Sequence, residues 1–220
     1  MQREKTHQKT PTAAPAYTLG EEITNAVSHG VTAAGAAVGT VLLILKSLPD
    51  PWRIVSSSIY GASMLLLFTM SCLYHAISAP RGKRVMRVFD HISIFLLIGG
   101  TYTPVTLVTL RGVVGWVLFG IVWGACLLGI VLNAVSIERF KRFSMLCYIA
   151  AGWSVAAAAV PTVRAMAPGG LILLLAGGIA YTAGIPFYKM KHRRYFHCIW
   201  HFFVTAGAVL HFFAVYFYII

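Results

Sequence analysis

Two histidines four residues apart, His197 and His201, are the strongest chemical signal in the sequence. Side chains at positions i and i+4 lie on one face of a helix, and two imidazoles in this arrangement can hold one zinc ion. His75, in a separate apolar segment, can supply a third nitrogen. Three protein ligands and one water form the open coordination of catalytic zinc. A zinc site at His75, His197 and His201 is therefore our first hypothesis.

Two further polar residues, Ser71 and Asp90, belong to the same hypothesis. Ser71 shares a helical face with His75, because the two are four residues apart. Asp90 is suited to accept a proton from a metal-bound water and to orient it. Ser71 is suited to hydrogen-bond to that water or to Asp90. We therefore expect catalytic roles for Asp90 and Ser71.

Each of these residues also has a purely structural explanation. A single H-x-x-x-H pair is a weak signal, and two histidines can simply form hydrogen bonds between helices. Ser71 can bond to a backbone carbonyl of its own helix. Asp90 can cap a helix or pair with Arg87. Spacing and residue type alone leave these explanations open.

Two other histidines fall outside the expected site. His91 points about 100° away from Asp90 around a helix, so we leave it out of the ligand set. His211 follows His201 by ten residues, which places it about 15 Å deeper along the helix axis. At that distance the two imidazoles cannot hold the same ion.

A second polar group near the N-terminus comprises Glu22, Asn25 and His29. We expect Glu22 to cap the first helix, where a carboxylate stabilises the free N–H groups. Its alternative role is an ion pair with an arginine of a neighbouring loop. His29 has a smaller expected role, in supporting the metal site from beneath.

The segments that must position these residues are strongly apolar. Of the 220 residues, 58% are hydrophobic and 11% are charged, against about 45–50% and about 25% in soluble domains. A membrane-crossing helix needs about 20 mainly apolar residues. Seven stretches qualify, at 24–46, 54–78, 88–109, 113–134, 143–165, 170–188 and 196–219. We therefore predict an all-α bundle of seven transmembrane helices at 23–220, after a flexible polar tail at 1–22.

The basic residues predict the orientation of this bundle. Of the 18 Lys and Arg residues, 14 lie in the N-terminal tail and in the loops on its side, and 4 lie on the other side. Cytoplasmic loops are enriched in Lys and Arg, so we expect the N-terminus in the cytoplasm and the C-terminus outside. The same placement explains the net charge of +12 without nucleic-acid binding. A multi-pass protein of the cell (inner or plasma) membrane is expected, with basic loops near anionic lipid head groups.

This orientation brings the candidate residues to one depth. The second helix runs inward, so Ser71 and His75 lie near its cytoplasmic end. The third and seventh helices run outward, so Asp90 and the pair His197 and His201 lie near their cytoplasmic beginnings. Three helices thus present their polar groups at a similar level, which favours one shared site.

Four motifs in order closely resemble the hemolysin III family over residues 21–220. They are E-E-I-x-N-x-x-S-H-G from Glu21 to Gly30, S-x-x-x-H from Ser71 to His75, F-D-H at 89–91 followed by G-T-Y-T-P at 100–104, and H-x-x-W-H from His197 to His201. That family is the prokaryotic branch of the progestin and adipoQ receptor superfamily, which is related to the alkaline ceramidases. The resemblance implies Zn²⁺ held by His75, His197 and His201, with Ser71 and Asp90 as the family's Ser and Asp.

The resemblance also implies hydrolysis of a lipid amide and a part in membrane lipid or energy homeostasis. Our leading hypothesis is a zinc-dependent hydrolase within the membrane, with membrane lipids as its partners and a lipid amide as its substrate. The alternative is a non-enzymatic sensor or regulator of membrane state that contains structural zinc. A pore-forming hemolysin, suggested by the family name, is disfavoured because the helices lack polar stripes that would line a pore.

Overall fold

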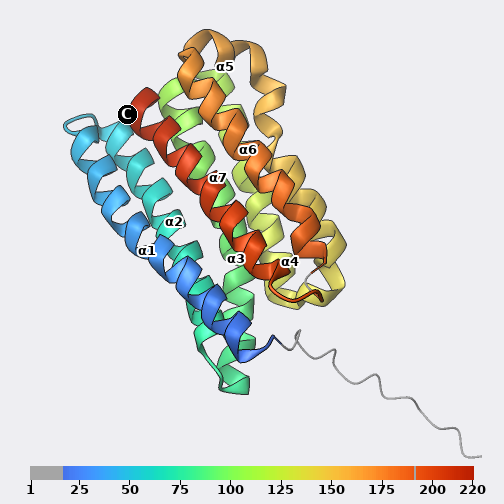
Figure 1. Ribbon diagram of the computed structural model, residues 1–220. Helices are drawn as coiled ribbons and strands as arrows, with labels where there is room; N and C mark the ends of the chain where they lie inside the picture. The colour runs from blue at the N-terminus through green and yellow to red at the C-terminus, as the bar shows by residue number, and fades with distance from the viewer. Residues whose placement is uncertain (1–16, 191) are drawn as a thin grey trace, which may run out of the picture.

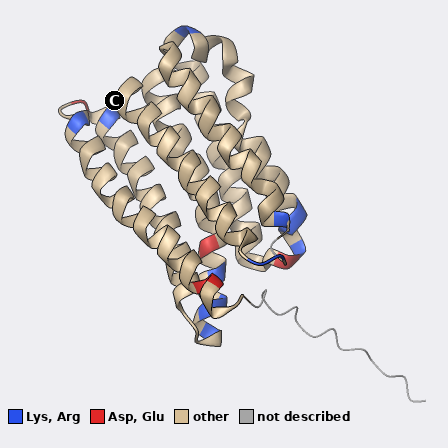
Figure 2. Ribbon diagram, in the orientation of Figure 1, with Lys and Arg blue, Asp and Glu red and all other residues tan. Residues whose placement is uncertain are grey.

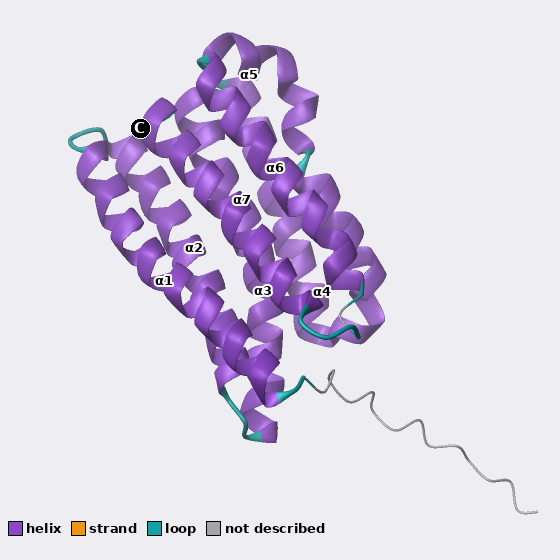
Figure 3. Cartoon of the chain, in the orientation of Figure 1, coloured by secondary structure: helices purple, strands orange, loops and turns teal. Residues whose placement is uncertain are grey.

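A computed structural model describes residues 17–190 and 192–220, and every element in this part of the chain is a helix (Figures 1 and 3). Six helical stretches here are long and apolar enough to cross a membrane. This confirms the prediction of an all-helical membrane protein. The elements are α1 (Leu19–Ser47), α2 (Pro51–Ala76), α3 (Pro80–Pro104), the π-helix η1 (Val105–Thr109), α4 (Val113–Gly152), the 3₁₀-helix η2 (Ser154–Ala158), α5 (Ala159–Ala165), α6 (Pro168–Lys189) and α7 (Phe196–Tyr218).

The first helix begins at Leu19, earlier than the predicted start at 24. Its cap explains the difference. The Thr18 hydroxyl accepts a hydrogen bond from the Glu21 backbone N–H, and the Glu21 carboxylate accepts one from the Thr18 backbone N–H. This capping box satisfies two of the free donors at the helix start. The predicted tail at 1–22 therefore overlaps α1, and its first 16 residues lie outside the described part of the chain.

Helix α4 departs most from the predicted boundaries. It joins the predicted helix at 113–134, the predicted loop and the first part of the predicted helix at 143–165, and the rest of that segment forms η2 and α5. The backbone of α4 is extended at Ser136, with φ −165° and ψ 108°. The Asn133 side-chain amide donates a hydrogen bond to the Ser144 hydroxyl over 2.7 Å, whereas a straight helix would place these positions about 16 Å apart. The chain thus reverses direction at Ser136, and the two arms of α4 run side by side (Figure 1).

Helix α3 packs against both arms of α4. A Cβ atom on Gly129 of the first arm would lie 2.2 Å from the ring of Phe95. The same ring contacts Tyr148 of the second arm, with centroids 4.3 Å apart. Further along, the Tyr102 hydroxyl donates to the carbonyl of Gly152 over 2.7 Å. These contacts hold the hairpin of α4 closed around α3.

The remaining helices complete one bundle. Helix α1 packs on α2 and α7, α2 packs on α3, and α6 packs on α7. Lys and Arg lie toward the ends of the helices, while the long middle stretches are largely uncharged (Figure 2). This distribution suits a bundle surrounded by hydrocarbon, because a charged side chain at mid-membrane is costly.

Replacing Gly129 by alanine tests the packing of α3 against α4. The added methyl group would clash with Phe95, which is buried and has Tyr148 behind it. We expect a loss of about 1–3 kcal/mol of stability, as for other overpacked cores, measured by thermal unfolding in detergent. Gly120→Ala is the matched control on the same helix, because a Cβ there meets nothing within 4 Å. Equal melting temperatures for the two variants would contradict this packing.

Candidate metal centre

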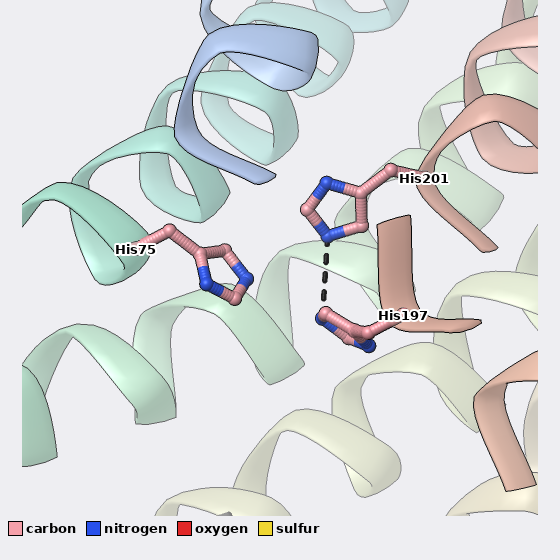
Figure 4. Close-up of side chains that lie close together, drawn as sticks. All are labelled: His75, His197 and His201. Atoms are coloured by element: carbon pink, nitrogen blue, oxygen red, sulfur yellow. Dashed lines mark hydrogen bonds between the residues drawn. The ribbon is translucent and has the colours of Figure 1, made fainter. Parts of the chain in front are cut away.

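The last turn of α2 and the first turns of α7 bring three buried imidazoles together. One ring nitrogen of each of His75, His197 and His201 lies within 4.8 Å of the others. His75 faces the α7 pair across the site (Figure 4). The Nε2 atoms of His197 and His201 are 3.2 Å apart. A tetrahedral zinc ion with Zn–N bonds of about 2.0–2.1 Å holds its ligands about 3.3 Å apart, so the predicted set fits a metal ion.

A carboxylate of α1 sets the tautomer of His75. The Nδ1 atom of His75 lies 2.7 Å from one carboxylate oxygen of Glu22. The other oxygen lies 2.7 Å from Lys83 Nζ. Because an ionised carboxylate only accepts hydrogen bonds, Nδ1 carries a proton, and the neutral form of the ring has its lone pair on Nε2. That Nε2 atom is buried and has no hydrogen-bond partner in the described part of the chain, as expected for a nitrogen that binds a metal ion.

A hydroxyl of α1 sets the tautomer of His201 in the same way. Ser28 Oγ donates its proton to the carbonyl of Asn25 over 2.9 Å. Its contact with His201 Nδ1, at 3.1 Å, therefore needs the imidazole as donor. His201 thus carries its proton on Nδ1 and presents a bare Nε2 to the site. Hydrogen bonds of this kind on the outer nitrogen are typical of metal-ligating histidines.

Two aromatic rings pack on the imidazoles. His29 stacks on His201 with centroids 3.6 Å apart and an interplanar angle of 5°. Tyr17 stacks on His197 with centroids 5.1 Å apart. Burial raises the pKa of the Tyr17 hydroxyl, so this phenol stays neutral at physiological pH. The two rings thus each cover one of the α7 histidines. Sequence patterns gave no sign of Tyr17, because it lies before the first apolar stretch.

The predicted role of Glu22 as a helix cap is wrong. Glu21 forms the capping box, while Glu22 turns toward α2 and bonds to His75 and Lys83. The alternative of an arginine partner is wrong as well, since the partner is a lysine. Two structural explanations for Asp90 also fail. Asp90 lies inside α3 rather than at its start, and Arg87 pairs with Glu138.

Asn25 and His29 lie behind the cluster on one face of α1. Their side-chain nitrogen and oxygen atoms are buried and have no hydrogen-bond partner among the described residues. Buried polar groups in this situation commonly bind internal water. His29 therefore borders the site, as expected from the sequence, but through ring stacking on His201 rather than as a fourth member of the ligand set.

Ser71 and Asp90 line the same cavity as His197 and His201. This cavity has a volume of about 160 Å³ and runs between α2, α3, α4, α6 and α7. Ser71 is buried, and the Asp90 side chain is 16% exposed. Both candidate catalytic residues therefore line the cavity that two of the three histidines also line.

His91 and His211, which the sequence placed outside the expected site, do not belong to the histidine cluster in the structure. His91 Nδ1 donates a hydrogen bond to the carbonyl of Arg87 over 2.8 Å. His211 Nε2 donates to the carbonyl of Leu174 over 3.0 Å. His211 also lines the cavity, but it lies about 15 Å from His201 along the axis of α7.

Sequence comparisons identify the family of this chain. A family model described as "Haemolysin-III related" matches residues 17–212. The chain belongs to the hemolysin III family. This hemolysin III protein is 39% identical over 202 residues to "Hemolysin-3" of Bacillus cereus, covering 91% of this chain and 92% of that protein. It is 39% identical over 204 residues to the "Hemolysin-3 homolog" of Bacillus subtilis (strain 168), covering 92% of this chain and 96% of that protein.

A more distant relative extends the relationship beyond bacteria. The "Monocyte to macrophage differentiation factor" of Homo sapiens is 26% identical over 208 residues, covering 92% of this hemolysin III chain and 86% of the human one. This match fits the progestin and adipoQ receptor superfamily. The resemblance drawn from the four sequence motifs is therefore confirmed.

Removing the carboxylate behind His75 should weaken metal binding in this hemolysin III protein. Without Glu22, the His75 imidazole can rotate or carry its proton on Nε2. We expect Glu22→Ala to lower zinc affinity by about 10–100-fold, as for other groups that orient a metal ligand. Competition with a chelator would measure it.

Asp50→Ala is the control for a general loss of stability. Asp50 caps the opposite end of α2 through the backbone N–H of Trp52. Its loss should cost about 0.5–2 kcal/mol of stability without changing zinc affinity. Unchanged zinc affinity in Glu22→Ala would contradict the orienting role of Glu22.

Proposed function

We propose that this protein is a zinc-dependent hydrolase that cleaves an amide bond of a membrane lipid. One observation carries the proposal. Three buried imidazoles converge, and two of them, His197 and His201, line a largely apolar cavity together with Asp90 and Ser71. His75 and His201 both present a bare Nε2 atom, because Glu22 and Ser28 hold the protons on the other nitrogens. Membership in the hemolysin III family supports the same assignment.

The residues around the proposed metal divide the chemistry between them. Zinc held by His75, His197 and His201 would supply a Lewis acid and would lower the pKa of a coordinated water toward about 7. The Asp90 carboxylate accepts a proton from the attacking water and later delivers it to the leaving amine. The Ser71 hydroxyl donates a hydrogen bond to the amide oxygen as negative charge develops there. The apolar wall of the cavity takes the lipid chain and keeps bulk water out.

The proposed setting is a cell (inner or plasma) membrane crossed seven times, with the N-terminus in the cytoplasm. The reversal of α4 at Ser136 supports seven crossings, because each arm can span separately. The excess of Lys and Arg at the end that carries the histidines supports a cytoplasmic position for the site. Substrate would then come from membrane lipids, and the activity would serve membrane lipid homeostasis.

A second candidate function has its own supporting observation. The histidines and their partners join three helices, since Glu22 and Ser28 of α1 bond to His75 of α2 and His201 of α7. A zinc ion here would clamp these helices together. Such a protein would be a sensor or regulator of membrane state, with structural zinc and no turnover.

The metal content of purified protein tests the part that both candidates share. We expect one zinc ion per chain in the wild-type protein and none in His197→Ala, because two imidazoles hold zinc weakly. His211→Ala removes a histidine from the same helix but outside the ligand group, so it should keep its zinc. Metal-free wild-type protein, measured by elemental analysis after purification without chelator, would refute the site.

Asp90→Asn separates the two candidates. The amide side chain keeps the size of aspartate but cannot accept the proton of the attacking water. We expect the variant to keep its zinc and its melting temperature while lipid-amide hydrolysis falls by at least about 100-fold. Hydrolysis is measured with a fluorescent N-acyl lipid in detergent micelles. Zinc-loaded wild-type protein without zinc-dependent turnover would favour the structural role instead.

A further inference from the structure

The cavity continues far beyond the metal centre and meets a second polar pair. Tyr181 of α6 and His211 of α7 line the same cavity as Ser71 and Asp90. A second cavity of about 310 Å³, lined almost wholly by apolar side chains, shares His211 as a lining residue. His211 therefore lies where the two cavities meet, and Tyr181 lines the first cavity beside it. The proposed hydrolytic mechanism gives the pair no role.

Tyr181 and His211 are held in place by reciprocal packing between α6 and α7. A Cβ atom on Gly207 of α7 would lie 2.8 Å from the Tyr181 ring, and one on Gly177 of α6 would lie 2.2 Å from the His211 ring. Each ring thus occupies the space that a glycine leaves open on the opposite helix. The two rings meet edge to face, with centroids 5.4 Å apart. Side chains fixed in this way are preorganised for a ligand.

The hydrogen-bonding capacity of the pair is only partly used. His211 Nε2 lies 3.0 Å from the carbonyl oxygen of Leu174, and a carbonyl can only accept, so Nε2 carries the ring proton. The Nδ1 atom of the neutral ring is then an acceptor. This Nδ1 atom and the Tyr181 hydroxyl oxygen are both buried, and neither has a hydrogen-bond partner among the described residues. Leaving such groups unpaired away from water costs free energy.

We propose that Tyr181 and His211 form a binding subsite for a hydroxyl group on the hydrocarbon chain of a lipid in the cavity. A hydroxyl both donates and accepts through one atom, so it can donate to His211 Nδ1 and accept from the Tyr181 hydroxyl. A carbonyl group could only accept a hydrogen bond from Tyr181. A plain methylene group could form a hydrogen bond with neither residue. The inference rests on the proposed lipid-hydrolase function and narrows its substrate class to lipids with a hydroxylated chain.

The spacing of the two sites sets where that hydroxyl lies. His211 follows the metal-site residue His201 by ten positions in α7, about 15 Å along the helix axis. The amide head would lie at the histidine cluster, and the hydroxyl would lie well down the chain. A hydroxyl next to the amide would not reach the pair.

Binding of matched lipids to the full-length protein tests the subsite. The probes are saturated N-acylethanolamides of one chain length, either unsubstituted or with a single hydroxyl at successive positions along the chain. We expect wild-type protein in nanodiscs to bind one mid-chain isomer about 10–100-fold tighter than the unsubstituted lipid, because a polar site rejects a ligand that leaves its groups unpaired. Competition with a fluorescent lipid measures the affinities.

Two variants should abolish the preference for the hydroxylated lipid while they still bind the unsubstituted lipid. Tyr181→Phe keeps the ring over Gly207, and His211→Leu removes the acceptor. Tyr60→Phe makes the same chemical change at a buried tyrosine that bonds to the carbonyl of Ala208 instead, and it should keep the preference. Melting temperatures would verify that all three variants are folded.

The metal-free variant separates this inference from the hydrolase proposal. His197→Ala should lose turnover but still prefer the hydroxylated lipid, since the subsite lies outside the metal group. Equal affinity of wild-type protein for all probes would overturn the inference and assign the polar pair to bound water. A preference that survives in both Tyr181→Phe and His211→Leu would overturn it too, as would a failure to bind any of these lipids.

Discussion

The hydrogen bond between Glu22 and His75 is the contact on which the arrangement of the site depends. It joins α1 to α2, fixes the proton of His75 on Nδ1, and so directs Nε2 toward α7. Lys83 balances the carboxylate from the following helix. Away from water, an unpaired charge or a misplaced proton is costly. Glu22, His75 and Lys83 therefore stabilise one another, and the loss of one would disturb the positions of the others. Helix α1, which holds none of the three proposed ligands, therefore decides how the ligands present themselves.

Glycines set the geometry of the rest of the bundle. Helices in lipid gain little from the hydrophobic effect and associate through close packing and hydrogen bonds. Gly129 admits Phe95, and Gly177 and Gly207 admit His211 and Tyr181. In each case an aromatic or imidazole ring fills the space beside a bare backbone. Two of these rings, Tyr181 and His211, line the cavity between α3, the second arm of α4, α6 and α7, so glycines on the opposite helix set their positions there.

Local patterns were enough to predict most of the fold, and they failed where tertiary contacts intervene. Runs of apolar residues predicted the long helices other than α4, because hydropathy is a property of each segment alone. The boundary in α4 was predicted as a loop, since charged residues at 138–142 interrupt the apolar pattern. The structure keeps them helical and turns the chain at Ser136, where the bond from Asn133 to Ser144 closes the hairpin. The earlier start of α1 was readable in the T-x-x-E sequence of Thr18 to Glu21, but polar composition obscured it.

The sequence by itself determined which side chains could form the centre. Spacing paired His197 with His201 and Ser71 with His75, and the family resemblance joined them with Asp90. Only the tertiary structure decided what orients and surrounds them: Glu22 behind His75, Ser28 behind His201, and Tyr17 and His29 stacked on the rings. The physical reason is that helical periodicity relates residues within one helix. Contacts between helices depend on how each helix is rotated and how closely it approaches its neighbours, and those are set by packing throughout the bundle.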